Sequence, residues 1–181
     1  MDVVCRPELD ADEVAVRDVV RRAFGKQRVA DLVDSLRASA DWAFGAVAVG
    51  SGELVGYVGF SHGVLDAPPR LVDVLVLSPL GVVPEWQGRG IGSTLVRHGL
   101  SLVSDVPMVF LEGSPRYYPR FGFRPGGELG FRRPSLRIPE PAFQVLLRPG
   151  HEEWMTGTLV YPRAFWDHDC VGLREPPGDR Q

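Results

Sequence analysis

A long apolar run, three closely spaced glycines and a second apolar segment follow one another between residues 71 and 103. The run at 71–84 is rich in Leu and Val, which predicts one or two central strands, and Pro84 ends it. Apolar residues in 92–103 recur at helical spacing. Gly88, Gly90 and Gly92 lie between the two, so this stretch predicts a strand, a glycine loop and a helix in immediate succession.

Such a loop can serve one of two purposes. Glycine lets a ligand approach the backbone closely, and the free N–H groups and dipole of the following helix attract an anion such as a pyrophosphate. Arg89 would add positive charge, and Pro84 would leave backbone groups of Val82 and Val83 free for a ligand. The alternative is a turn that serves only tight packing between strand and helix, and the loop alone leaves both open.

Two nucleotide-binding motifs share this outline, and the residues argue against both. A Walker A loop requires Lys followed by Ser or Thr after its last glycine, whereas Gly92 is followed by Ser93 and Thr94. A Rossmann fingerprint requires Gly or Ala at the position of Ser93 and belongs to the first strand of its fold. Several predicted elements precede this loop, so neither site is expected.

The rest of the chain predicts a mixed domain around one sheet. One helix is expected from an N-cap at Asp10 or Asp12 to Phe24, where Gly25 ends it, and a second at 29–36. A short helix at 114–123 would begin with Ser114 as N-cap and Pro115 at the first helical position. Further strands are expected at 3–7, 44–50, 53–62, 106–113, 142–150 and 156–162, with 44–50 and 53–62 forming a hairpin. This order predicts an α+β or mixed α/β fold.

The composition of the 181 residues limits the possible partners. The net charge is −3 and Lys26 is the only lysine, which gives no general attraction to nucleic acid. No apolar stretch is long enough to span a membrane, and the N-terminus lacks the apolar region of a signal peptide, so a cytoplasmic protein is expected. Cys5 and Cys170 are therefore expected to be free thiols.

Two separated motifs resemble those of a known superfamily. The segment QGRGIG, from Gln87 to Gly92, is similar to motif A of the GNAT acyltransferases, Q/R-x-x-G-x-G/A. The segment YYPRFGF, from Tyr117 to Phe123, is similar to their motif B, Tyr-x-x-x-Gly-Phe. Together with the stretches at 143–150 and 157–166, these motifs resemble the YhbS-like bacterial subgroup. The resemblance covers about 3–166 and implies a single N-acetyltransferase domain over 1–181, with 167–181 as a flexible or packing tail.

The resemblance implies a fold and a cofactor. GNAT domains have a mixed, mostly antiparallel sheet that splays into a V between flanking helices, with acetyl-CoA in the opening. Carried over to this chain, the pantetheine arm pairs with the backbone at 81–83 and the pyrophosphate lies on the amides of 89–93. The residues implied to bind acetyl-CoA are Gly81, Val82, Val83, Gln87, Gly88, Arg89, Gly90, Ile91, Gly92 and Ser93.

The implied reaction is direct transfer of an acetyl group to a primary amine. Tyr118, four residues before the Gly of Gly-Phe, matches the general acid of the superfamily, and a phenol suits protonation of a thiolate of similar basicity. The alternative is that Tyr118 only packs beside Phe121 and Phe123, as we expect of Tyr117.

The sequence offers several candidates for the general base. Glu112 is the candidate because it ends a predicted strand near the expected thioester, while Asp73, His62 and a relaying water are alternatives. The subgroup commonly has Gly-Asp-Pro where this chain has Gly-Ser-Pro at 113–115. A serine can still cap a helix there, but any role of the aspartate charge is lost.

The expected partners are acetyl-CoA and an amine acceptor, with no nucleic acid, membrane or metal. The four histidines are scattered and show no paired ligand spacing. The arginine-containing segment 131–141 is interpreted as a solvated loop, with an overhang of the substrate mouth as the alternative. The chain is expected to be a monomer or a homodimer. Besides an N-acetyltransferase, the alternative function is a catalytically silent acyl-CoA-binding sensor or partner module.

Overall fold

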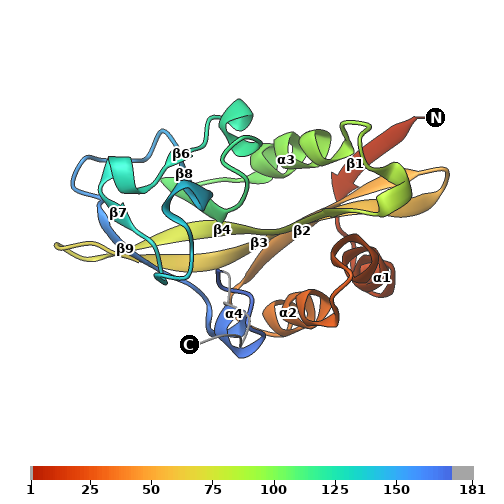
Figure 1. The fold of residues 1–181 in the computed structure, drawn as a ribbon, viewed down its shortest axis with the longest axis horizontal. Helices are drawn as coiled ribbons and strands as arrows, with labels where there is room; N and C mark the ends of the chain where they lie inside the picture. Colours follow the sequence, from red (N-terminus) through yellow and green to blue (C-terminus); the bar gives the residue numbers. More distant parts are fainter. Residues whose placement is uncertain (1, 173–181) are drawn as a thin grey trace, which may run out of the picture.

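One sheet of nine strands organises residues 2–172, the part of the chain described by this computed structural model (Figure 1). Its order is β1-β2-β3-β4-β5-β8-β6, and β9 pairs with both β3 and β7. Neighbouring strands are antiparallel except for β4–β5 and β7–β9. The strands are β1 (Val3–Pro7), β2 (Trp42–Gly50), β3 (Glu53–Asp66), β4 (Leu71–Val82), β5 (Met108–Glu112), β6 (Arg124–Pro125), β7 (Phe131–Arg132), β8 (Phe143–Leu147) and β9 (Gly157–Val160).

Helices cover both faces of the sheet (Figure 1). Helix α3 lies on one face, and α1, α2 and α4 lie on the other. The α-helices are α1 (Glu13–Phe24), α2 (Gln27–Arg37), α3 (Ile91–Leu102) and α4 (Arg163–Asp167), and the short 3-10 helices are η1 (Asp10–Asp12), η2 (Pro84–Trp86), η3 (Tyr118–Phe121), η4 (Gly127–Leu129) and η5 (Glu140–Ala142). The predicted mixed α/β class, with a mostly antiparallel sheet between flanking helices, is confirmed.

Some elements agree with the sequence prediction, and others differ from it at their ends or in type. The apolar run at 71–84, for which one or two strands were expected, forms the single strand β4, which ends at Val82. Helix α1 ends at Phe24, and Gly25 takes the left-handed conformation expected of a terminating glycine, with φ of 62°. The helix expected at 114–123 is wrong, because only the four-residue η3 forms within that segment. The short strands β6 and β7 were not predicted. Cys5 and Cys170 are free, as expected.

The sheet opens between β4 and β5. These parallel strands pair only at Leu75 with Val109 and at Val76 with Phe110. Strand β4 nevertheless remains paired with β3 as far as Val82. Beyond Val76, the edge of β4 that turns away from β3 therefore has no strand beside it in the described part of the chain. This divergence forms the predicted V.

Close packing of α1 on β4 forms one wall near the opening. A Cβ added to Gly81 would lie 2.8 Å from the Cβ of Ala23 and 3.0 Å from the Phe24 ring. Because neither contact leaves room for a side chain, glycine at this position lets the helix approach the strand backbone.

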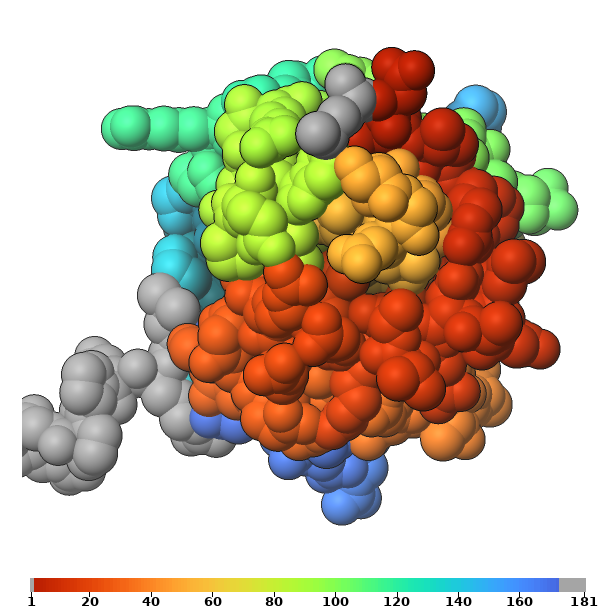
Figure 2. Space-filling model, turned by 90° about the vertical axis from the view of Figure 1, so that its right-hand side faces the viewer, coloured from red at the N-terminus to blue at the C-terminus, as the bar shows by residue number. Residues whose placement is uncertain are grey.

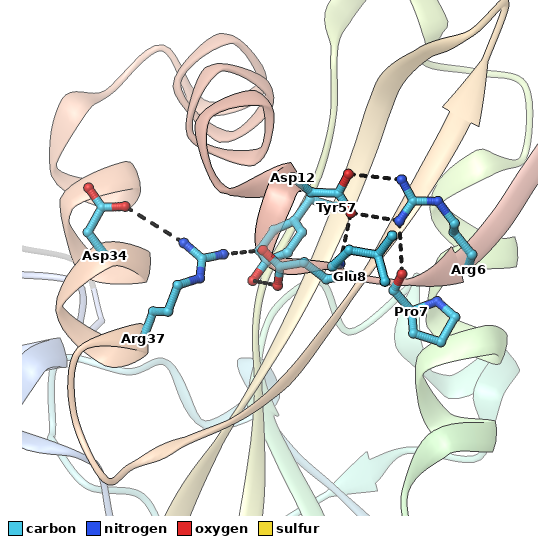
Figure 3. Close-up of polar contacts among 8 residues, drawn as sticks. Arg6, Pro7, Glu8, Asp12, Asp34, Arg37 and Tyr57 are labelled. Atoms are coloured by element: carbon cyan, nitrogen blue, oxygen red, sulfur yellow. Dashed lines mark hydrogen bonds and ion pairs between the residues drawn. The ribbon is translucent and has the colours of Figure 1, made fainter.

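A polar cluster joins the end of β1 to the start of α1 (Figure 3). The Arg6 guanidinium donates hydrogen bonds of 2.6 and 2.9 Å to the Asp12 carboxylate, and the Leu9 N–H donates a third at 2.8 Å. Asp12 does occupy the N-cap position of α1, but its side chain caps no helix N–H. The carboxylate instead accepts a hydrogen bond from the Leu9 N–H in the loop that leads into the helix.

A second group of polar contacts lies beside the first (Figure 3). The buried Glu8 carboxylate accepts a hydrogen bond from Arg37 of α2 and lies 3.5 Å from the hydroxyl of Tyr57 on β3. Arg37 also lies over the Trp42 ring, 5.3 Å from its centroid. These contacts tie β1, α2 and the centre of the sheet together.

We expect Asp12→Asn to lower the free energy of unfolding by about 1–3 kcal/mol at neutral pH, because hydrogen bonds to a charged group contribute about that much. The bonds from Arg6 hold the pKa of the Asp12 carboxyl below its ordinary value. This stability is therefore fully present above the unfolded pKa of about 3.9 and is lost as pH falls through the lower folded pKa. Urea unfolding of both proteins from about pH 7 down to about pH 1–2 measures the difference.

The control is Glu53→Gln, since Glu53 is exposed at the start of β3 and makes no ion pair with any described residue. Its unfolding free energy should match the wild type across the pH range. A difference between Asp12→Asn and wild type that persists unchanged in acid would contradict the assigned role of the carboxylate.

Candidate active site

The glycine loop presents free backbone amides at the start of α3. Gly88 and Gly90 have φ angles of 73° and 79°, a left-handed conformation that favours glycine. Helical hydrogen bonding begins with the Thr94 N–H, which donates to the Gly90 carbonyl at 3.1 Å. The amides of 91–93 therefore have no partner within the helix, and together with the helix dipole they favour an anion.

These amides border a pocket of about 370 Å³, the glycine-loop pocket. The loop, yellow-green in Figure 2, lies at the surface beside the β2–β3 hairpin. Every residue that the resemblance implied for acetyl-CoA lines this pocket except Val83 and Arg89. The lining consists of Leu80, Gly81, Val82, Trp86, Gln87, Gly88, Gly90, Ile91, Gly92, Ser93, Tyr117 and Arg120.

The backbone of Val83 is not free, in contrast to the expectation from Pro84. Val83 is buried, and its N–H donates to the Val55 carbonyl of β3 at 3.0 Å. Hydrogen-bonded and non-hydrogen-bonded pairs alternate along an antiparallel ladder, so the backbone groups of Val82 and Leu80 turn away from β3 into the opening. The Val82 carbonyl accepts a bond of 2.8 Å from the Gln87 side chain, which holds the loop against β4.

Arg89 turns to the outer side of the loop. Its guanidinium lies 4.9 Å from the centroid of the Trp86 ring and donates to the Glu85 carbonyl at 3.0 Å. It lines a neighbouring hollow that Ile91 and Thr94 also border. The charge expected from Arg89 is therefore next to the glycine-loop pocket rather than in its lining.

Tyr117 and Arg120 line the glycine-loop pocket, although the sequence indicates only packing for Tyr117 and no role for Arg120. The Tyr117 hydroxyl lies 3.4 Å from the Ser93 hydroxyl, and a Cβ on Gly92 would come within 2.9 Å of it. The Arg120 guanidinium lies 4.7 Å from the centroid of the Tyr117 ring and brings a cation to the pocket. Their spacing of three residues around a 3-10 turn places them on one side, which is the signal that could have found them.

A second pocket of about 260 Å³ lies on the α1–α2 side of the sheet and contains both predicted catalytic residues, Tyr118 and Glu112. We call it the Glu112 pocket. Leu80 of β4 lines both pockets, so the two share this residue at the open edge of that strand. The lining consists of Phe24, Lys26, Arg28, Val29, Leu32, Leu77, Ser78, Pro79, Leu80, Glu112, Tyr118, Asp169, Cys170 and Gly172.

Tyr118 combines a packed ring with an unengaged hydroxyl. Its ring packs at an angle to those of Tyr117 and Phe123, with centroids 5.0 and 5.9 Å away, and burial raises its pKa. The hydroxyl makes no hydrogen bond with any residue in 2–172. The side chain is thus held in place and kept protonated, with its proton available to the pocket.

Glu112 ends β5 with its carboxylate held by two donors. The Gly172 N–H donates to one oxygen at 2.9 Å, and the Tyr161 hydroxyl lies 3.4 Å from the other. Burial raises the pKa of this carboxyl, although both hydrogen bonds oppose the shift. A carboxylate of raised basicity suits proton abstraction near neutral pH.

The alternative bases lie elsewhere. Asp73, near the start of β4, lines a different hollow with Asp105 and Arg148. His62 is exposed on β3 opposite Leu75. Neither lines the Glu112 pocket, so of the three side chains considered as the base, Glu112 is the one that shares a pocket with Tyr118.

The turn at 113–118 is held from β8 rather than by a helix cap. Ser114 accepts a weak bond from the Arg116 N–H, and its carbonyl accepts from Tyr117, but η3 begins only at Tyr118. The buried Gln144 amide lies 3.3 Å from both the Gly113 and the Ser114 carbonyls. Gln144 therefore positions the turn that carries both tyrosines.

The described residues contain no group of three or more His, Cys, Asp or Glu arranged to hold a metal ion. None of their helices has the length and apolar character of a membrane span.

Comparison with known proteins places this geometry in a family. Residues 41–125 match the family described as Acetyltransferase (GNAT) domain. The Escherichia coli N-acetyltransferase YjhQ is 38% identical over 139 residues, which cover 72% of this chain and 74% of YjhQ. The E. coli N-acetyltransferase YhbS is 31% identical over 169 residues, which cover 90% of this chain and 98% of YhbS.

Two solved structures share the whole arrangement. E. coli YhbS in complex with CoA has a TM-score of 0.80 at 29% identity, covering 90% of this chain and 91% of YhbS. A GNAT family acetyltransferase of Brucella melitensis in complex with acetyl-CoA has a TM-score of 0.73 at 29% identity, covering 91% of this chain and 98% of that protein. The motifs, the splayed sheet and these relatives agree: the chain belongs to the GNAT family of acetyltransferases and is similar to YhbS and YjhQ.

We expect Gly90→Ala to weaken acetyl-CoA binding about tenfold or more, because a displaced loop loses hydrogen bonds to a charged group. The matched control is Gly52→Ala at the β2–β3 turn, where φ is 83° and, as at Gly90, nothing lies within 4 Å of an added Cβ. Both substitutions should lower stability by a similar amount of about 1 kcal/mol. Calorimetric titration with acetyl-CoA should show weakened binding only for Gly90→Ala. Equal affinity in the two variants would contradict the role of the loop.

Proposed function

We propose that this protein transfers the acetyl group of acetyl-CoA directly to the primary amine of a small molecule or peptide. The observation that carries the proposal is that Leu80 lines two pockets, one bordered by free helix amides and the other holding Tyr118 and Glu112. The complexes of YhbS with CoA and of the Brucella protein with acetyl-CoA support the same donor here.

Each side of the site has a defined part in binding acetyl-CoA. The pyrophosphate lies on the amides of 91–93, with Arg120 and Arg89 nearby as cations. The pantetheine arm pairs with the free edge of β4, at Leu80 and Val82 rather than at Val83, because the Val83 N–H is bonded to β3. This brings the thioester to the level of Leu80, between the two pockets.

The chemistry follows from the groups around that point. Glu112 takes a proton from the ammonium form of the acceptor, and the neutral amine attacks the thioester carbon while a backbone N–H on the free edge of β4 stabilises the oxyanion. The C–N bond forms, the C–S bond breaks, and the Tyr118 hydroxyl gives its proton to the departing thiolate. The nitrogen loses its second proton, which returns to the Tyr118 oxygen through water, and Glu112 releases its proton to solvent. The unengaged hydroxyl of Tyr118 favours this enzyme over a silent acyl-CoA-binding module.

We also propose a cellular location and an oligomeric state for this enzyme. With a net charge of −3, we expect no nucleic acid partner. We propose that the enzyme is a monomer or a homodimer in the cytoplasm.

Tyr118→Phe should lower kcat about 100-fold or more, since the variant removes the proton donor to the leaving thiolate and keeps the ring. Acetyl-CoA affinity should stay within about twofold of wild type, because Tyr118 lies outside the glycine-loop pocket. Release of free thiol gives kcat, and calorimetry gives affinity. An unchanged kcat would show that Tyr118 serves packing alone.

Glu112→Gln should remove the acid limb of the pH–rate profile. The side-chain oxygen of the glutamine still accepts the hydrogen bond from the Gly172 N–H, so this contact is kept. The wild-type kcat/KM should fall as pH drops through the raised pKa of Glu112, because the carboxyl becomes protonated and no longer accepts the amine proton. The variant should be slow at every pH, without that limb. A variant with the wild-type profile would assign the base to another group or to water.

A further inference from the structure

The mouth of the Glu112 pocket carries two cations that the reaction itself does not use. Lys26 precedes α2 and Arg28 belongs to its first turn, and both side chains are exposed where they line the pocket. The carboxyl of Glu112 lies in the same pocket. The pocket thus joins a basic rim to a proton acceptor.

The acidic group nearest the rim is already paired. Asp169 lies 3.6 Å from Arg28 and 3.3 Å from Arg137, so two guanidinium groups share its charge. Lys26 makes no ion pair with any residue among those described. The rim therefore holds a cation whose charge no neighbouring carboxylate in 2–172 neutralises.

The thiol of Cys170 lies within electrostatic range of all these groups. Burial raises its pKa most, Arg28 and Lys26 lower it, and Asp169 and Glu112 raise it. Cys170 also lines the pocket, so its reactivity can report the local charge there.

The remaining lining is apolar and the space is small. Phe24, Val29, Leu32, Leu77 and Leu80 form the apolar part. The volume of about 260 Å³ lies just below the range of about 300–1,000 Å³ typical of ligand pockets. This size suits a short molecule with one polar group at each end.

We propose, building on the acetyl transfer above, that the acceptor is a small primary amine that carries a carboxylate. Its amine lies at Glu112 and Tyr118, and its carboxylate lies at the rim with Lys26 and Arg28. The cations at the rim thus select for an anionic acceptor and orient its amine toward the thioester.

Matched acceptors test this selection. Thiol release should be measured for β-alanine against β-alaninamide and for glycine against glycinamide, with KM expressed per unprotonated amine. We expect the acids to have the lower KM, and Lys26→Gln to raise the KM of the acids roughly five- to tenfold, somewhat more than an exposed ion pair gives. The KM of the amides should not change. Arg163→Gln, which removes an exposed charge paired with Asp167, should change neither.

Alkylation of Cys170 provides a test that needs no turnover. The rates of modification by iodoacetate, an anion, and by iodoacetamide, its neutral counterpart, are followed at each cysteine by mass spectrometry. Cys5 on β1 is the internal control. The iodoacetate-to-iodoacetamide ratio should be higher at Cys170 than at Cys5, should fall in Lys26→Gln and should recover in Lys26→Arg.

The two tests separate the inference from the function on which it rests. Acetylation of amides in preference to acids, with a Cys170 ratio no higher than that of Cys5, would overturn the anionic acceptor and leave the acetyltransferase intact. A raised, Lys26-dependent ratio without thiol release from any acceptor would instead overturn acetyl transfer and leave an anion site.

Discussion

The short pairing between β4 and β5 is the constraint on which both pockets depend. Two residue pairs join these strands, and beyond them β4 keeps its ladder with β3 while its other edge is left without a strand. A longer β4–β5 ladder would cover the backbone of Leu80 and Val82 and would separate Glu112 from the glycine loop. An unpaired strand edge is normally a liability in a sheet, and here it is the place where a substrate can add its own hydrogen bonds.

The donor side of the site was largely predictable because it is continuous in the chain. The order of strand, glycine loop and helix from Gly81 to Ser93 fixes the loop geometry locally, and most of these residues line one pocket. The exception at Val83 depends on which residues pair across β3 and β4, and hydrophobic pattern does not specify that register. The outward turn of Arg89 likewise depends on the Trp86 ring beside it.

The Glu112 pocket was far less predictable because its lining comes from separate parts of the chain. Lys26, Glu112, Tyr118 and Cys170 belong to four segments, and no local periodicity relates them. Sequence similarity indicated the Tyr118 role, and strand position indicated Glu112, but the basic rim required the packing of α2 against α4. The role of Gln144 was also invisible, since a polar residue within a predicted apolar strand gives no sign of which carbonyls it will meet.

The segment that follows α4 forms part of the wall of the Glu112 pocket and is anchored there by several contacts. The Ser35 hydroxyl lies 2.6 Å from His168, Gly172 donates to Glu112, and a Cβ on Gly172 would lie 2.6 Å from the Arg137 backbone. Proteolytic trimming behind α4 would expose the Glu112 carboxyl to water and enlarge the pocket, while the glycine loop stayed intact. Under the proposed function, a change in this C-terminal segment would therefore alter the acceptor that the pocket takes, without any change in how the acetyl donor is held.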